Sequence, residues 1–174
     1  MRSFVTLFFA TMLLLLNVGC KRQGGVTLHS AEVAKMEWSA EDVEQSGLPE
    51  SVVLALDVEN KGAAVVLRSG RVRVSYRGRR VAMFTLEEKV RIAGHKRSEV
   101  NLPLKINVVR NSQTAALWQA LQRHDAEGIS VDWDAVVRAG VVRANVERSP
   151  MPLAELMQGE ALDKVWSLAD QMMK

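Results

Sequence analysis

The chain has one cysteine, Cys20, in 174 residues, and only three histidines. A single thiol cannot close a disulfide within the chain, so a folded domain must be held together by its apolar core. His29, His95 and His124 are far apart in the sequence, and their spacing does not predict a metal site. The signatures His-Glu-x-x-His and Gly-x-Ser-x-Gly and the glycine-rich phosphate loop are missing too. We therefore expect no enzymatic activity, no metal and no cofactor.

A large excess of charge is also missing, since 23 Lys and Arg stand against 20 Asp and Glu. This balance argues against nucleic acid as a partner. The charges are unevenly placed, however, because residues 68–80 contain six arginines and no acid. Arg71, Arg73 and Arg77 could form a face for an anionic partner such as lipid head groups or polysaccharide. The alternative is that these arginines lie on the outward side of two strands and face neighbouring acids.

Long apolar runs are absent except for one at the start of the chain. Residues 4–16 are largely apolar and follow Met1-Arg2. A positive start, a short apolar stretch and a small residue after it are typical of an export signal. The run is too short for a membrane-spanning helix, which needs about 20 residues. We expect residues 1–19 to be a signal peptide; a retained anchor, or an ordinary signal peptide that leaves Cys20 free, are the alternatives.

The end of this leader, Val18-Gly19-Cys20-Lys21, resembles the lipobox of bacterial lipoproteins. The resemblance implies cleavage after Gly19 and a diacylglyceryl group on the thiol of Cys20, so that the membrane is a partner through this anchor. Two or more acyl chains hold a protein stably on a membrane. Asp after the cysteine favours the inner membrane in such families. Lys21 therefore implies the outer membrane of the cell envelope, facing the periplasm, with residues 20–29 as a lipidated tether.

Alternation of apolar and polar residues predicts strands up to about residue 110. Every second residue is apolar in residues 51–60, and the same period recurs in residues 71–76 and 99–108. Ser69-Gly70 and Arg77-Gly78 are typical of tight turns and predict two consecutive hairpins. This part of the chain therefore predicts an antiparallel sheet.

Other features interrupt or follow the strands. Pro103 has no N–H to donate to a neighbouring strand, so we expect its strand to lie at an edge or to be bulged there. Residues 113–124 carry an apolar stripe at helical spacing and predict one inserted helix, which Gly128 closes. Strands resume at residues 129–133 and 136–146. After Ser149-Pro150-Met151-Pro152, the tail predicts an amphipathic helix that packs on the domain or presents Met and Trp to a partner or membrane.

Asp132 and Asp134 flank Trp133 in one of these strands and would share one face of it. The two carboxylates could hold a cation, and Trp133 could stack on a sugar. The alternative is a solvated strand edge with Trp133 turned into the core.

The stretch 52–108 is similar to the late embryogenesis abundant type 2 domain, also called the water stress and hypersensitive response domain. The similar phrases are residues 54–60, 76–82 and 98–104. Residues 129–153 resemble the way in which bacterial lipoprotein members of that family end. The resemblance implies an all-β, immunoglobulin/fibronectin-like antiparallel β-sandwich at residues 30–152, with one inserted short helix and a C-terminal helix at residues 153–174.

The resemblance also implies a function. Such a protein would be a non-enzymatic envelope lipoprotein that binds or stabilises other envelope components, for example under water or osmotic stress. Two alternatives stay open: an interaction module that recruits an envelope protein, and an anionic glycan- or lipid-binding domain that uses the arginine face.

Overall fold

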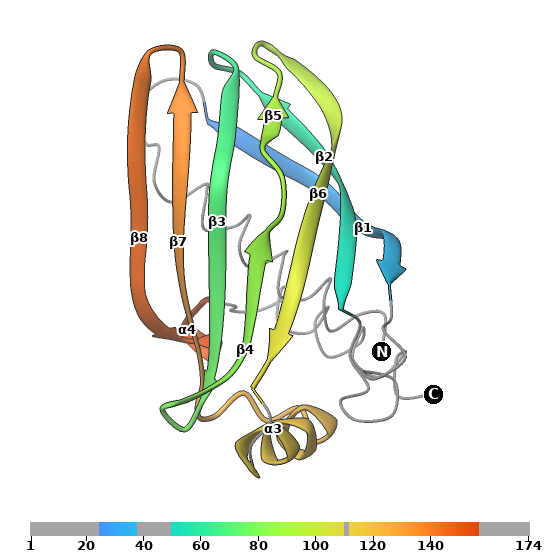
Figure 1. The fold of residues 1–174 in the computed structure, drawn as a ribbon, viewed down its shortest axis with the longest axis vertical. Coiled ribbons are helices and arrows are strands. Elements are labelled where there is room, and N and C mark those ends of the chain that lie inside the picture. Colours follow the sequence, from blue (N-terminus) through green and yellow to red (C-terminus); the bar gives the residue numbers. More distant parts are fainter. Residues whose placement is uncertain (1–24, 38–49, 110–111, 157–174) are drawn as a thin grey trace.

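The computed structural model describes residues 25–37, 50–109 and 112–156 (Figure 1). The expected signal peptide, Cys20 and Lys21 lie outside these residues, and so does the tail beyond residue 156. Among the described residues, no helix combines the length and the apolar character that crossing a membrane requires.

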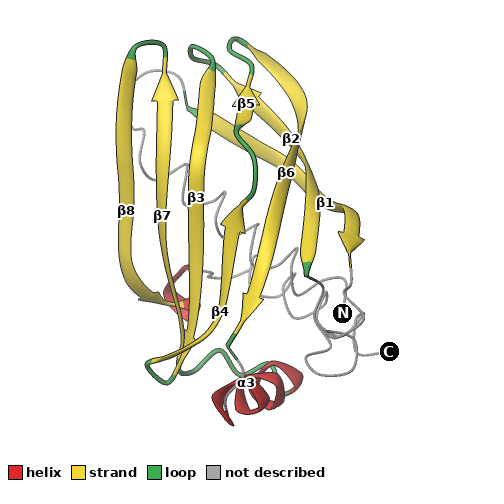
Figure 2. Ribbon diagram, in the orientation of Figure 1, coloured by secondary structure: helices red, strands yellow, loops and turns green. Residues whose placement is uncertain are grey.

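Antiparallel strands dominate this part of the chain and are joined edge to edge in one curled, eight-stranded sheet (Figures 1 and 2). The strand order is β1-β2-β6-β4-β3-β7-β8, and β5 pairs with β3. The predicted all-β, antiparallel architecture is confirmed, whereas an immunoglobulin-like division into two facing sheets is not. The strands are β1 (Val26–Glu37), β2 (Ser51–Asn60), β3 (Val65–Tyr76), β4 (Arg79–Leu86), β5 (Val90–Ile92), β6 (Lys96–Val108), β7 (Ile129–Ala139) and β8 (Val142–Pro152).

The core lies on one side of the sheet, because each strand turns alternate residues toward it. In β2 every second residue from Val52 to Asn60 is buried. In β6 the same alternation buries every second residue from Val100 to Ile106. The two strands pair without a register shift, so their apolar rows lie side by side. The core positions predicted from the period of two are confirmed in both strands.

β3 is longer than predicted, because the chain does not turn at Ser69-Gly70. Gly70 is buried within the strand, and the register with β7 shifts between Leu67 and Ser69, which marks a bulge. The extra residue changes the phase of the strand, so that Leu67 before it and Val72 after it both face the core. The first predicted hairpin is therefore wrong, and the glycine belongs to a bulged strand.

The second predicted hairpin is confirmed. Arg77 and Gly78 connect β3 to β4, and both have positive φ angles, 48° and 77°. Two successive residues in the left-handed region are typical of the turn whose twist matches that of the paired strands. A hydrogen bond to another segment also stabilises the turn: the N–H of Arg77 donates to the carbonyl oxygen of Gly128 at 2.7 Å.

Pro103 lies inside the sheet, because β6 has β2 on one side and β4 on the other. The predicted edge or bulge is wrong for β6, and the neighbouring strand is interrupted instead. The β4–β6 ladder ends at Leu86 opposite Leu104, and residues 87–89 separate β4 from β5. At this break Glu87 donates its N–H to the carbonyl oxygen of Pro103 at 3.0 Å. The N–H and C=O of a strand residue point to the same side, so the missing N–H of Pro103 faces the break and no ladder bond is lost.

The inserted helix is confirmed as α3 (Ser112–Gln122), and Leu117 and Ala120 bury its apolar stripe in the core. The helix ends at Gln122, and His124 in the turn that follows has a φ of 55°, which reverses the chain. Gly128 was expected to close the helix, but it precedes β7 instead, with a φ of 77°.

A turn at Gly140-Val141 connects β7 to β8. The strand break predicted between residues 133 and 136 is wrong, because β7 continues to Ala139. Gly140 has a φ of 58°, which favours glycine at this turn. β8 extends to Pro152 and thus includes residues 149–152, which were expected to form a connection. β8 is the last strand on the sheet path, where prolines are tolerated. α4 (Leu153–Leu156) follows it, and the rest of the predicted tail helix lies outside the described residues.

The first strand begins earlier than expected. β1 starts at Val26, which pairs with Asn60 of β2, so residues 26–29 belong to the sheet and not to a tether. Two register shifts interrupt the ladder between β1 and β2. Such irregularities are common in edge strands, because they hinder pairing with a further strand.

Several loops meet at one end of the sheet, at the top of Figure 1, which we refer to as the upper end. The chain enters the fold there at Gly25, next to the end of β2. The loops after β2 and β5 touch, because His95 donates its N–H to the carbonyl oxygen of Gly62 at 3.0 Å. The β7–β8 turn belongs to the same end, since Ala139 pairs with Val65, the first residue of β3.

Gly94 is predicted to be essential for this contact between loops. A Cβ atom on Gly94 would lie 2.6 Å from the nitrogen of Ala64 and 2.7 Å from the carbonyl oxygen of Gly62. Because backbone would have to move, Gly94→Ala should lower the free energy of unfolding by about 1–3 kcal/mol in urea denaturation. Gly70→Ala is the matched control, since its new Cβ would meet neighbours only at 3.9 and 4.0 Å. Equal stability of the two variants would contradict this account.

Candidate functional site

Four charged side chains form a ladder on the outer side of β3 and β7. Arg71 lies opposite Asp134, and Arg73 lies opposite Asp132. Arg73 bridges both acids, because its Nε donates to Asp132 Oδ1 and its Nη1 donates to Asp134 Oδ1 at 2.7 Å. Arg71 Nε donates to the other carboxylate oxygen of Asp134 at 3.1 Å. The signs alternate along the ladder, so each carboxylate has a guanidinium beside it.

Arg73 is the more buried of the two arginines, with 17% of its side chain exposed against 55% for Arg71. Burial alone would lower the pKa of the Arg73 guanidinium, but the hydrogen bonds and charges of Asp132 and Asp134 outweigh burial and raise that pKa. Two of the three arginines expected to form an anionic-ligand face thus direct their donors at neighbouring acids. This is the alternative arrangement left open by the sequence.

Arg77 is separate from the ladder. It lies exposed in the β3–β4 turn, at the opposite end of the sheet from Gly25, and its guanidinium carbon is 5.2 Å from the centre of the Tyr76 ring. This distance fits a cation–π contact. Arg71, Arg73 and Arg77 therefore do not combine into one open surface.

Asp132 and Asp134 share one face of β7, as predicted, but Arg73 binds to both. Trp133, between them, is only 4% exposed and belongs to the core. The hypothesis that Trp133 stacks on a sugar is therefore wrong, and its placement in the core is confirmed.

The three histidines remain apart in the fold. His29 Nε2 lies 3.3 Å from Glu59 across the β1–β2 pair, His95 lies in the turn before β6, and His124 lies in the turn after α3. The described residues contain no group of three or more His, Cys, Asp or Glu side chains that could hold a metal ion.

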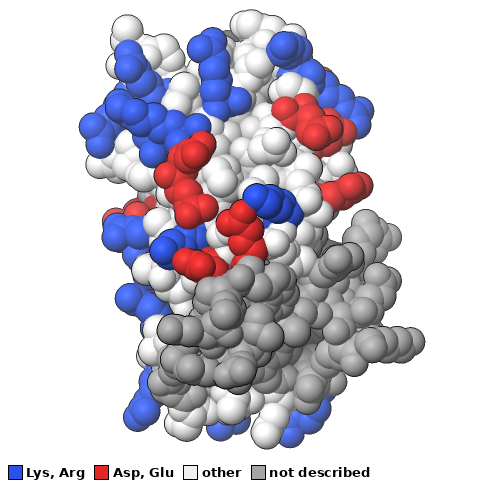
Figure 3. Space-filling view, turned by 45° about the vertical axis from the view of Figure 1, so that its right-hand side comes forward, with Lys and Arg blue, Asp and Glu red and all other residues white. Residues whose placement is uncertain are grey.

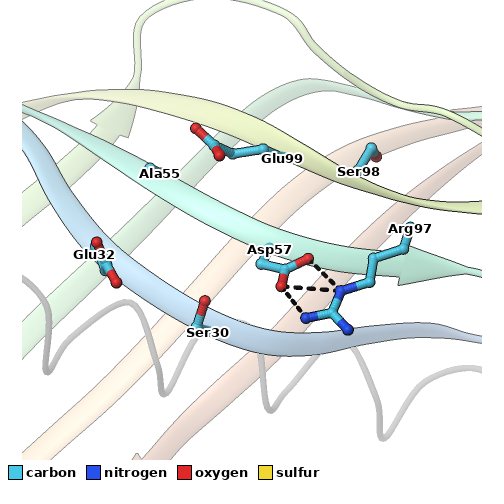
Figure 4. A pocket seen from close by; sticks show the side chains of 7 residues that line it. All are labelled: Ser30, Glu32, Ala55, Asp57, Arg97, Ser98 and Glu99. Atoms are coloured by element: carbon cyan, nitrogen blue, oxygen red, sulfur yellow. Dashed lines mark hydrogen bonds and ion pairs between the residues drawn. The ribbon is translucent and has the colours of Figure 1, made fainter.

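The outer side of β1, β2 and β6 carries a hollow of about 460 Å³ (Figure 4). Arg97 of β6 forms an ion pair there with Asp57 of β2, and its Nε donates to the two carboxylate oxygens at 2.8 and 3.0 Å. Hydrogen bonds from Arg97 lower the pKa of the Asp57 carboxyl, and Asp57 in turn raises the pKa of Arg97. Glu32 and Glu99 also line the hollow but do not converge on one point (Figure 4). The hollow thus contains a closed ion pair and two separate acids, which is a poor arrangement for a specific ligand.

A second hollow, of about 430 Å³, lies at the upper end and is lined by basic side chains. Val66 of β3 lies opposite Arg91 of β5 on one side and opposite Arg138 of β7 on the other. Cross-strand neighbours share a face, so the two arginines flank Val66 on the outer side of the sheet. Arg68 and Lys89 also line this hollow, and all four basic residues are exposed. Within the described ranges, none of the four forms an ion pair.

This second basic group was not predicted from the sequence, because its members come from segments that are distant in the chain. A signal was nevertheless present. Residues 61–68, 89–97 and 138–143 all contain Lys or Arg and no acid. Only the pairing of β3 with both β5 and β7 shows that these segments meet.

No family model matches the chain, and no curated protein matches it significantly. One solved structure, described as "Crystal structure of protein from Archaeoglobus fulgidus", is 14% identical, with a TM-score of 0.38. The match covers 72% of this chain and 97% of that chain. A likeness of this strength carries no argument about function.

The ladder predicts unequal roles for its two arginines. Arg73→Ala would leave Asp132 without its guanidinium and next to Asp134, and both acids are poorly solvated, with only 16% and 26% of their side chains exposed. We expect it to lower the free energy of unfolding by about 2 kcal/mol. Arg71→Ala removes an exposed partner and should cost less than about 1 kcal/mol. Urea denaturation of both variants at neutral pH measures the difference, and a larger loss from Arg71→Ala would refute the ladder as described.

The pair of Asp57 and Arg97 predicts a pH dependence. The lowered pKa of Asp57 means that the pair stabilises the fold at pH values above the unfolded-state pKa of about 3.9. This stabilisation is lost as the pH falls through the lower, folded-state pKa. Asp57→Asn should therefore be less stable than the parent chain at neutral pH, and the gap should close in acid. Urea midpoints over a pH series test this, and a gap that widens toward low pH would disprove it.

Proposed function

We propose that this protein is a lipid-anchored, non-enzymatic lipoprotein of the bacterial cell envelope. The observation that carries the proposal is the position of Cys20, which ends an apolar leader and precedes the first strand by only six residues, since β1 starts at Val26. Acylation at Cys20 would hold the domain on the membrane without any contribution from the fold. Lys21 after the cysteine places the protein, in this proposal, in the outer membrane facing the periplasm.

We further propose that the curled sheet is a variant of the sandwich of the late embryogenesis abundant type 2 domain. The short ladder between β6 and β4 supports this. β6 pairs with β4 only from Leu104 to Val108, and β5 pairs only with β3. Toward the upper end, β1, β2 and β6 can therefore separate from β5, β3, β7 and β8 as two layers that stay joined through β4.

The proposed role is to bind or stabilise other envelope components, including under water stress. Its support is the resemblance described above together with the character of the outer face. That face is rich in charge, and its hollows are open and lined by residues from several strands. Such surfaces suit broad contacts with large partners better than they suit capture of a small molecule.

Replacing Cys20 tests the anchor. In cells carrying Cys20→Ser, we expect the acyl mass to be lost and the protein to leave the membrane fraction. Mass spectrometry of the purified chain and membrane fractionation measure these outcomes. An unmodified Cys20 in membrane-bound parent protein would refute the anchor.

Two comparisons in the same cells refine the test. Lys21→Asp keeps the acyl group and should move the protein to the inner membrane, so it controls for the anchor itself.

Survival of drying by cells with the parent chain, compared with cells with Cys20→Ser, tests the stress role. Equal survival would exclude a membrane-bound role in tolerance of water loss.

A further inference from the structure

The upper end combines seven exposed basic side chains with the two most exposed large apolar residues of the described chain. Val141 and Val142, at the β7–β8 turn, are 94% and 65% exposed. Exposed Lys and Arg side chains lie at the same end, and in Figure 3 basic side chains gather toward the top of the molecule, with acidic ones mainly below. The basic residues are Lys61, Arg68, Lys89, Arg91, Lys96, Arg138 and Arg143.

These charges are free to act on a partner. None of these seven side chains forms an ion pair with another described residue. The ion pairs join β3 to β7, β1 to β2 and β2 to β6, and one lies along β1. Arg138 makes only a backbone contact, from its Nε to the carbonyl oxygen of Gly140 at 2.8 Å, which fixes it beside the exposed turn. A basic surface around an apolar tip is the pattern by which proteins adhere to anionic bilayers.

If Cys20 is acylated as proposed above, the path of the chain keeps the same end near the membrane. Gly25 lies at the upper end, where its carbonyl oxygen faces the N–H of Lys61. Gly25 is five positions after Cys20, and a fully extended chain of that length spans at most about 18 Å. With Cys20 acylated, the upper end cannot move farther than this from the lipid surface.

We propose that the upper end is a membrane-docking surface for anionic phospholipid head groups. The hollow between Arg68, Arg91 and Arg138 accepts the phosphate groups, and the turn at Val141 enters the interface between head groups and acyl chains. This proposal rests on the anchor proposed above, but it adds a defined orientation of the domain. The arginine face predicted from the sequence plays no part, because Arg71 and Arg73 are paired with acids.

The test uses the acylated protein in vesicles of phosphatidylglycerol and phosphatidylethanolamine. Acylated Cys20 has no free thiol, so one introduced cysteine can carry an environment-sensitive fluorophore. Val141→Cys reports on the upper end, and Arg79→Cys, in the hairpin at the opposite end, is the control. We expect a blue shift and quenching by brominated lipid for the probe at residue 141, and neither for the probe at residue 79.

Charge reversal tests the electrostatic part. Arg91→Glu with Arg138→Glu should lower the equilibrium constant for docking by about 25-fold or more, because each basic residue near an anionic surface contributes about 1 kcal/mol. Arg79→Glu with Arg123→Glu changes the net charge equally at the other end and should leave the probe at residue 141 unaffected. Replacing the lipids by phosphatidylcholine should release the upper end in the parent chain.

The outcomes separate the two proposals. Absence of acyl mass on Cys20 would overturn the anchor, and with it this proposal. An acylated protein whose two probes behave alike, or whose probe at residue 141 ignores the reversal at Arg91 and Arg138, would overturn the docking surface alone.

Discussion

The arrangement of the whole sheet depends on the bulge in β3 between Leu67 and Ser69. β3 pairs with β4, β5 and β7, so its side chains determine which face of three neighbours is buried. Leu67 and Val72 are five positions apart, and an unbroken strand would turn them to opposite sides. A slip of one residue exchanges the two faces of a strand. Without the extra residue, half of β3 would expose its apolar side chains.

The same bulge also determines which arginines of β3 lie next to acids. Arg68 falls within it and remains on the outside at the upper end, where it lines the basic hollow. Arg71 and Arg73 follow it and point outward at the level of Asp134 and Asp132. One inserted residue thus separates an arginine that stays free from two that are neutralised. Charge counts along the sequence carry no information about this difference, because pairing depends on the register between strands.

Local pattern predicted more of the fold than of the charged surfaces. The buried rows of β2 and β6, the turn at Arg77-Gly78 and the inserted helix follow from short-range periodicity and backbone preference. Two predictions were wrong because glycine and proline each occur in more than one kind of strand irregularity. Gly70 serves a bulge, and Pro103 faces a break in its neighbour, so both need the partner strand to be understood.

The basic hollow could not be located from the sequence, for a related physical reason. Arg91 and Arg138 are brought to either side of Val66 by two separate ladders. Each arginine alone looks like an ordinary solvated side chain. The acid-free segments were visible, but their meeting is a property of topology.

The short connection before Gly25 has a consequence for affinity. Linking two binding elements by a short flexible segment gives an effective local concentration in the millimolar range. With an acyl anchor at Cys20, the basic surface would encounter lipid head groups at that concentration at all times. A contact with a dissociation constant near millimolar would therefore hold the domain against the bilayer about half of the time. Modest changes in ionic strength or lipid charge would then shift the domain between a docked and an undocked orientation while the acyl anchor keeps it on the membrane.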